Sequence, residues 1–297
     1  MHVGVQLPNN EVEPERGALR ELIQGIEELG FHHAHVVDHV VGADPVTYAD
    51  RDYLPYDATS VVHEPLTLFG FLTACAPRLH LMSAVLVLPQ RQTALVAKQA
   101  AEIDLLTGGK FRLGVGVGWN DIEYEALGMS FRTRGKRIEE QVELLRRFWT
   151  EEIVTFDGAF DHVRAVSVNP PPVQRPIPIW FGGSVERARR RAAVIGDGLV
   201  MQLPTPDVPL ESEWPKMMEE MRGWRREAGK PGDVGFEARL TLDLERTPEQ
   251  WRTTVSQWQE LGASHIAIRT IRLGLCGTEE HLARFAFAAD VLRDFMT

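Results

Sequence analysis

An aspartate and a histidine stand side by side, Asp38 and His39, directly after a short apolar stretch. If that stretch is a strand of a parallel barrel, the pair lies at its carboxyl end, where such barrels carry their chemistry. A histidine accepts or donates a proton near pH 7, and a carboxylate accepts a hydrogen bond from the N–H of a heterocycle. The pair therefore indicates proton transfer beside a ring. An aspartate that caps the next segment, beside a surface histidine, remains the alternative.

The run GVGVGW (114–119) ends a later predicted strand. Glycines at a strand end allow a flat ligand to approach the backbone closely. The run is not a dinucleotide-binding fingerprint, because Trp119 stands where the third glycine of that motif would be. A tight turn from strand to helix explains the pattern equally well.

The run FGGS (181–184) follows another predicted strand and precedes a predicted helix. Gly182 and Gly183 expose backbone N–H groups, Ser184 can cap the helix, and the amino end of a helix binds phosphate. This arrangement predicts a phosphate site. The alternative is an ordinary serine-capped helix with a solvated basic face.

Three histidines, His33, His35 and His39, raise the question of a metal site. His33 and His35 share one face of the predicted strand, because side chains alternate along a strand. A barrel metal site needs ligands from further strands, but the first and last predicted strands end in QLPNN and IRT. We therefore expect no bound metal. The motifs of serine hydrolases and of P-loop proteins are also absent.

The elements that must position these residues alternate along the whole chain. Short β-branched runs predict eight strands, at His2–Leu7, Ala34–Val37, Leu79–Leu88, Phe111–Gly116, Ile177–Phe181, Gly198–Gln202, Phe236–Leu242 and His265–Arg269. Amphipathic stretches predict helices at Glu15–Leu29, Pro65–Ala76, Thr93–Leu106, Arg132–Thr150, Val185–Ile195, Glu213–Ala228, Pro248–Leu261 and Glu279–Phe295.

This alternation, without a run of consecutive strands, indicates a parallel sheet covered by helices. Eight repeats in one chain favour closure into a (β/α)₈ barrel, the α/β TIM barrel fold. A doubly wound sheet is the alternative, but no linker separates two halves. We therefore predict one domain over residues 1–297.

Two long connections interrupt the pattern, one at 40–63 after strand 2 and one at 151–176 before strand 5. Connections of this length in a compact domain are usually functional or disordered. The first begins at the active-site end of the predicted barrel and contains three of the four tyrosines, so we expect a lid. A packing loop is the alternative. The second follows a helix and should begin at the opposite end, and FDGAF (156–160) predicts a hairpin within it.

Composition narrows the class of protein. With 32 Lys and Arg against 42 Asp and Glu, the net charge of −10 disfavours nucleic-acid binding, which needs a basic face. No run of 18 apolar residues predicts a membrane span, and MHVGVQLP does not resemble a signal peptide. We expect the two cysteines, Cys75 and Cys276, to be reduced. These features predict a cytoplasmic enzyme that acts on small molecules.

Taken together, five segments resemble the luciferase-like monooxygenase superfamily, in particular its coenzyme F-420-dependent branch. They are ELGFHHAHVVDHV (28–40), SAVLVLPQRQTALVAKQAAEIDLLTGGKFRLGVGVGW (83–119), RGKRIEEQVELLRRFW (134–149), PPPVQRPIPIWFGGS (170–184) and GDG (196–198). One of these segments alone would be weak evidence for the family, but the presence of all five in this order and spacing is specific to it.

The resemblance implies a barrel that holds a tricyclic ring at its carboxyl end. It implies that Asp38 hydrogen-bonds the ring and that His39 is catalytic. It also implies a non-prolyl cis peptide between Ala84 and Val85. The remaining residues that it places near the cofactor are Ser83 in the bulge behind the ring, Gly116, Val117 and Gly118 in the wall of strand 4, and Gly182, Gly183 and Ser184 near the phosphate.

Two positions depart from the family pattern. Trp119 stands where members that oxidise sugar phosphates carry a glutamate acid, so that reaction is in doubt. Ala84 replaces a residue that is often glycine or serine.

The expected reaction is therefore hydride transfer between coenzyme F-420 and a small organic substrate, with His39 moving the balancing proton. FMN, with a monooxygenase reaction, is the alternative cofactor. A flavin- or deazaflavin-binding protein without turnover is the second alternative. The resemblance also implies a homodimer.

Overall fold

The computed structural model describes residues 1–51, 55–201, 209–242 and 245–296. Within these ranges the main sheet contains nine parallel strands. They are β1 (His2–Gln6), β2 (His33–Val36), β3 (His80–Ser83), β4 (Leu86–Val87), β5 (Phe111–Gly116), β8 (Ile179–Gly182), β9 (Gly198–Val200), β10 (Gly235–Thr241) and β11 (His265–Arg269). β3 and β4 are two parts of one barrel position, and both pair with β5, which closes the sheet into an eight-position barrel.

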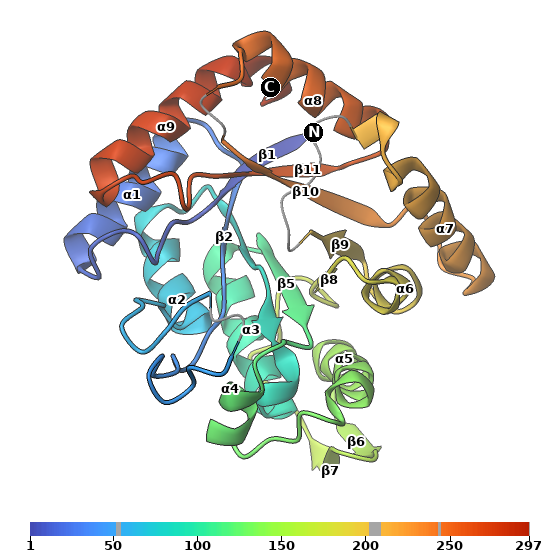
Figure 1. Cartoon of the computed structure of the whole chain (residues 1–297). Helices are drawn as coiled ribbons and strands as arrows, with labels where there is room; N and C mark the ends of the chain where they lie inside the picture. The colour runs from blue at the N-terminus through green and yellow to red at the C-terminus, as the bar shows by residue number, and fades with distance from the viewer. Residues whose placement is uncertain (52–54, 202–208, 243–244, 297) are drawn as a thin grey trace.

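Helices surround the strands on the outside (Figure 1). They are α1 (Arg16–Glu28), α2 (Pro65–Cys75), α3 (Thr93–Thr107), α4 (Asp121–Ala126), α5 (Arg134–Thr150), α6 (Glu186–Val194), α7 (Trp214–Glu227), α8 (Pro248–Glu260) and α9 (Gly277–Val291). The predicted α/β TIM barrel is thus confirmed. Among the helices described, none is both long and apolar enough to cross a membrane.

The hydrophobic core has two separate parts. The larger part lies between the sheet and the helices, where Ile266 and Ile268 of β11 are fully buried. The smaller part lies inside the barrel and consists of Met82, Trp180 and Val200. This division follows from the alternation of side chains along each strand.

Trp180 fills the inside of the barrel because two of the residues beside its ring are glycines. A Cβ atom at Gly198 would lie 2.3 Å from the Trp180 ring, and one at Gly235 would lie 2.5 Å from it. These two glycines begin β9 and β10, so the indole closes the lower part of the barrel.

One predicted strand is interrupted. Residues 79–88 were expected to form a single strand, but pairing stops after Ser83 and resumes at Leu86. The peptide bond between Ala84 and Val85 is cis, as the resemblance implied.

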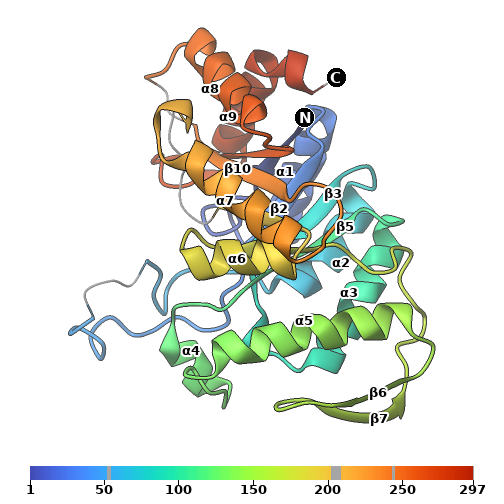
Figure 2. The same ribbon diagram turned by 90° about the vertical axis from the view of Figure 1, so that its right-hand side faces the viewer.

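The two long connections lie where the sequence predicted. The first projects beside α4, at the carboxyl end of the barrel (Figure 2). Tyr53 in this connection and Gln202, the predicted end of β9, fall outside the described residues. The second connection contains the predicted hairpin, formed by β6 (Val154–Asp157) and β7 (His162–Val166).

Candidate active site

His39 lies just beyond the carboxyl end of β2, with 22% of its side chain exposed. Its ring packs on Tyr56 of the first long connection, with 3.9 Å between ring centroids. The Trp119 ring lies 6.4 Å from it and 5.8 Å from Tyr56. The imidazole is thus surrounded by aromatic rings at the carboxyl end of the strands. We call this end of the barrel the mouth.

A carboxylate that the sequence analysis missed lies behind this histidine. Glu123 of α4 is 1% exposed, and its Oε1 lies 3.4 Å from His39 Nδ1. The same oxygen accepts the Val40 backbone N–H at 2.8 Å, and Oε2 accepts from Gln90 at 3.3 Å. Burial alone would raise the pKa of Glu123, but the hydrogen bond and charge of His39, with these two donors, lower it below its ordinary value. Glu123 is therefore an ionised partner for His39.

A capping signal in the sequence could have revealed Glu123. Asn120 caps α4 by accepting the Ile122 N–H at 3.1 Å, and Glu123 follows three residues later. That spacing is the known signature of a helix start. The helix α4 was not among the predicted helices, so no acidic residue was expected in the segment that follows β5.

Asp38 is more deeply buried than the sequence suggested, with 0% of its side chain exposed. One carboxylate oxygen lies 2.7 Å from Arg91 Nη2, and the other accepts the Val87 N–H at 2.9 Å. Burial raises the pKa of Asp38, although Arg91 and Val87 oppose that rise. In this structure Asp38 thus holds the segment that follows the cis bond.

The glycines of 114–118 accommodate that same segment. A Cβ at Gly114 would lie 1.9 Å from the Ser83 carbonyl, one at Gly116 would lie 2.6 Å from Val85, and one at Gly118 would lie 2.6 Å from Val87. The alternating glycines therefore let two stretches of backbone pack closely at the mouth. Ser83 also donates to the Gly114 carbonyl at 2.8 Å.

The FGGS segment adopts the predicted turn but not the predicted cap. Val185, not Ser184, occupies the cap position of α6, and no side chain caps the helix. Gly183 has φ of +136°, and its N–H donates to the Val200 carbonyl at 3.3 Å. The Ser184 carbonyl accepts from Arg189 at 2.6 Å. The expected serine cap is thus wrong, because the turn at Gly183 carries the chain one residue further before the helix begins.

The two histidines of β2 face a buried carboxylate. Glu237 Oε1 accepts from His35 Nδ1 at 2.9 Å, and its Oε2 lies 3.1 Å from His33 Nε2. Arg112 donates to Glu237 at 3.2 Å and stacks on Trp180. We call these five residues the barrel floor. Over the described ranges, no group of three or more His, Cys, Asp or Glu side chains is arranged to hold a metal ion.

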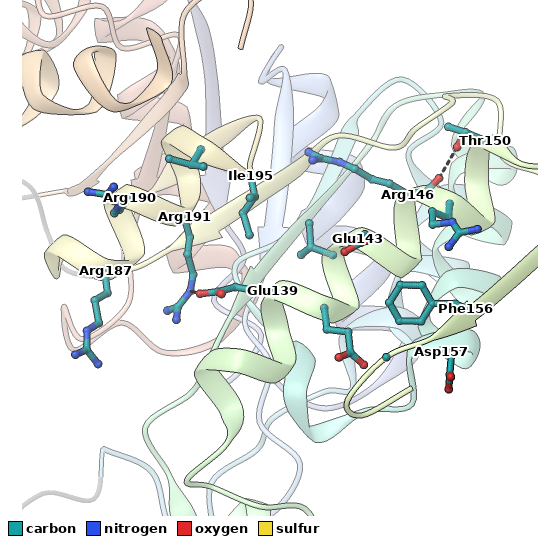
Figure 3. Close-up of a pocket in the computed structure, with 15 residues that line it drawn as sticks. Glu139, Glu143, Arg146, Thr150, Phe156, Asp157, Arg187, Arg190, Arg191 and Ile195 are labelled. Atoms are coloured by element: carbon teal, nitrogen blue, oxygen red, sulfur yellow. Dashed lines mark hydrogen bonds and ion pairs between the residues drawn. The ribbon is translucent and has the colours of Figure 1, made fainter. Parts of the chain in front are cut away.

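A cavity of about 1220 Å³ lies elsewhere, on the outside of the barrel between α5, α6 and the hairpin. Its charged walls pair with one another: Arg191 lies 2.8 Å from Glu139 (Figure 3), and Arg146 lies 2.9 Å from Asp197. This groove lies against the outer helices and contains none of the predicted site residues. We therefore place the candidate active site at the mouth.

A family model for luciferase-like monooxygenases matches residues 1–294. The chain belongs to this family. Among curated relatives, an uncharacterized protein of Mycobacterium tuberculosis is 38% identical over 167 residues, which are 56% of this chain and 56% of that protein. The FMNH(2)-dependent dimethylsulfone monooxygenase of Pseudomonas putida is 36% identical over 139 residues, which are 46% of this chain and 38% of that enzyme. The chain thus spans about half the length of the curated relatives it matches.

Solved structures agree on the fold of this luciferase-like chain. An F-420-dependent secondary alcohol dehydrogenase, solved with an F-420–acetone adduct, has a TM-score of 0.77 and 16% identity and covers 98% of both chains. At that identity the likeness shows the fold alone.

The predicted site residues of the luciferase-like barrel fall into two neighbouring groups. One group surrounds the ends of β2, β3 and β5 and contains His39, Asp38, residues 83–85 and residues 116–118. The other group, residues 182–184, follows β8, which is the next strand after β5 in the sheet. Sequence reasoning missed Glu123 and the contact of Tyr56 with His39.

Proposed function

We propose that this luciferase-like protein is a coenzyme F-420-dependent oxidoreductase that transfers a hydride between the deazaflavin and a small organic substrate. The observation that carries the proposal is His39, partly exposed at the mouth and backed by the buried carboxylate of Glu123. Such a pair is suited to move one proton beside a bound ring.

The residues at the mouth fit a flat cofactor. Ala84, Val85, Gly116, Val117 and Gly118 would line the ring, since the glycines let the segment that contains Ala84 and Val85 pack closely against β5 and form one wall with it. Asp38 would act on the ring through the segment that it holds in place. Gly182, Gly183 and Ser184 would lie near the phosphate. When bound, the deazaflavin supplies a carbon that donates or accepts a hydride.

His39 provides the proton that balances the hydride. Its Nδ1 faces Glu123, so Nε2 is the nitrogen left for the substrate. Glu123 fixes the orientation of the imidazole ring, as a carboxylate does for a histidine in catalytic triads. Tyr56 packs on the other side, and Asn120 holds the Tyr56 hydroxyl at 2.7 Å. Burial raises the pKa of Tyr56 well above its ordinary value, so this hydroxyl stays neutral.

The connection at 40–63 serves as the lid that excludes water from the reaction. It reaches the rim of the barrel through Tyr56 and through Arg51, which forms a two-pronged pair with Asp121 of α4 at 2.9 and 3.1 Å. These contacts join the lid to the helix that carries Glu123.

FMN is the alternative cofactor, because the relative from Pseudomonas putida is described as FMNH(2)-dependent. A monooxygenase reaction would then replace hydride transfer to a substrate carbon. A binding protein without turnover is the second alternative, and the His39–Glu123 pair disfavours it.

Fluorescence titration of the purified protein with F-420 and with FMN tests the proposal. We expect F-420 to bind more tightly than FMN. Micromolar binding of FMN together with no binding of F-420 would refute it in favour of the alternative.

We further propose a homodimer that acts in the cytoplasm. The outer face of α3 exposes 52% of Leu95 and 56% of Leu106, and apolar side chains gathered on one helix face are typical of subunit interfaces. Sedimentation equilibrium of the wild type and of Leu106→Glu checks this, with a dimer expected for the first and a monomer for the second.

A further inference from the structure

Arg269, the last residue of β11, points into the barrel at its mouth. His265 of the same strand packs on Trp180 inside the barrel, and Ile266 and Ile268 pack outside it. Alternation along the strand therefore places Arg269 on the inner side with His265. Arg269 is level with Thr241 at the end of β10, so it lies above the barrel floor.

In the described residues, no carboxylate pairs with the Arg269 guanidinium in the way that Glu237 pairs with Arg112. Its Nε is buried without a hydrogen-bond partner, and it forms no ion pair within the described part of the chain. Among the described carboxylates, Glu11 acts on it, and Glu11 also accepts the Arg272 backbone N–H at 2.9 Å. Burial lowers the pKa of Arg269, and the charge of Arg272 lowers it further.

A second arginine increases the positive charge at this place. Arg239 of β10 is 4% exposed, and burial, together with the charge of Arg269, lowers its pKa to about 9, although Glu237 opposes that shift. Two neighbouring cations in a partly desolvated site repel each other, and an anion between them would relieve that repulsion. Arg239 itself donates to the Met201 carbonyl and to the Gln6 side chain, so Arg269 is the cation that we consider for a ligand.

Topology separates this position from the expected cofactor phosphate. Only β1 lies between β11 and β2, so Arg269 and the His39 strand are about 10 Å apart at a strand spacing of about 4.8 Å. On the other side, β9 and β10 separate β11 from β8, which carries Gly183. A ligand of a few carbon atoms can therefore contact Arg269 while it reaches toward His39.

We propose that Arg269 binds an oxyanion of the substrate, so that the enzyme acts on small carboxylates or similar anions held with their reactive carbon toward His39. The assignment of the bound anion as the substrate rests on the proposed function, but the anion site itself can be tested without a cofactor.

The probes are benzoate and benzamide, which have the same shape and differ in charge. Each is titrated by calorimetry into the wild type without cofactor. A charge-assisted hydrogen bond contributes about 1.5–3 kcal/mol, so we expect benzoate to bind at least roughly tenfold more tightly than benzamide. Arg269→Gln should remove this preference, and Arg269→Lys should retain part of it.

Arg272→Gln is the matched control, because it removes one positive charge from an exposed side chain at the same rim. It should keep the preference for benzoate. A wild type that binds both probes equally, or an Arg269→Gln protein that still prefers benzoate, overturns the proposal. Thermal unfolding of each variant identifies a protein that has failed to fold, and Arg269→Lys then decides the question.

Titration of the same variants with FMN and riboflavin separates the two sources of the anion. If Arg269→Gln weakens binding of FMN but not of riboflavin, Arg269 holds the cofactor phosphate and the substrate assignment is overturned. Unchanged affinities for both support it. A wild type that binds neither F-420 nor FMN refutes the proposed function instead, and the benzoate comparison still decides whether Arg269 is an anion site.

Discussion

The floor and the mouth of this barrel use the same kinds of side chain in opposite ways. At the floor, one carboxylate, Glu237, lies 2.9 to 3.2 Å from His33, His35 and Arg112, and these four side chains are nearly inaccessible. At the mouth, His39 is 22% exposed and lies 3.4 Å from its carboxylate, and Arg269 forms no ion pair in the described residues.

This difference teaches where to look for function in a polar barrel. Charged groups that satisfy one another stabilise the fold, because an unpaired buried charge costs much more than a paired one. Polar groups that remain partly exposed or incompletely paired are available to a ligand. Histidine content alone does not distinguish the two regions, whereas the partners of each histidine do.

The largest effect is expected at the mouth, from His39→Ala. Loss of a general acid or base lowers turnover by roughly 10²–10⁴-fold, and cofactor affinity should stay close to that of the wild type. The measurement is the single-turnover rate at saturating cofactor together with the cofactor dissociation constant. If His39 only packs on the cofactor ring, the cofactor affinity of His39→Ala falls and its turnover rate at saturating cofactor is nearly normal. The role of His39 would then be structural, like that of the floor histidines.

At the floor, Glu237→Gln should destabilise the fold by about 3–5 kcal/mol, because it leaves Arg112 as an uncompensated buried charge. Urea unfolding measures the change. Glu152→Gln, at an exposed position, is the control and should change stability by less than about 0.5 kcal/mol. An effect of the control's size at Glu237 would show that the floor is not held together by this carboxylate.

The floor should also make the fold sensitive to acid. Burial lowers the pKa of His33 to about 4, whereas a histidine in the unfolded chain has its ordinary pKa of 6.5. Below pH 6.5 the unfolded chain therefore binds the proton first, and stability falls as the pH decreases from 6.5 to about 4. One such histidine contributes up to about 1.4 kcal/mol per pH unit in this window.

Urea unfolding at several pH values between 7 and 4.5 measures this slope. His33→Asn should flatten it by the contribution of one histidine, and His162→Asn, at an exposed position, should leave it unchanged. Equal slopes in the wild type and His33→Asn would contradict a neutral His33 at the floor.

The smallest effect is expected for Arg51→Gln in the lid. Its pair with Asp121 is about half exposed, and such pairs contribute roughly 0.2–1 kcal/mol. Global stability should hardly change, but backbone amides of the 40–51 segment should exchange hydrogen faster, because the lid loses a contact with α4. Unchanged exchange would show that Tyr56 alone holds the lid.

Much of the fold could be predicted because it follows from local patterns. The alternation of strands and helices predicted the barrel, and the two gaps in this alternation predicted its long connections. Long-range partners could not be predicted. His35 and Glu237 are 202 positions apart, and Glu123 meets the segment after β2 from 83 positions away. The sequence also gave no sign that Asp38 would be enclosed by Arg91 and Val87, because burial depends on how three loops pack together.

The most direct test of the account is a crystal structure of the protein with bound F-420. We predict that the deazaflavin ring lies at the mouth, against Ala84, Val85 and Gly116, with its edge beside His39 and its phosphate near Gly183. A ring bound in the outer groove between α5 and α6, with His39 remote from it, would contradict the central claim that the mouth is the active site.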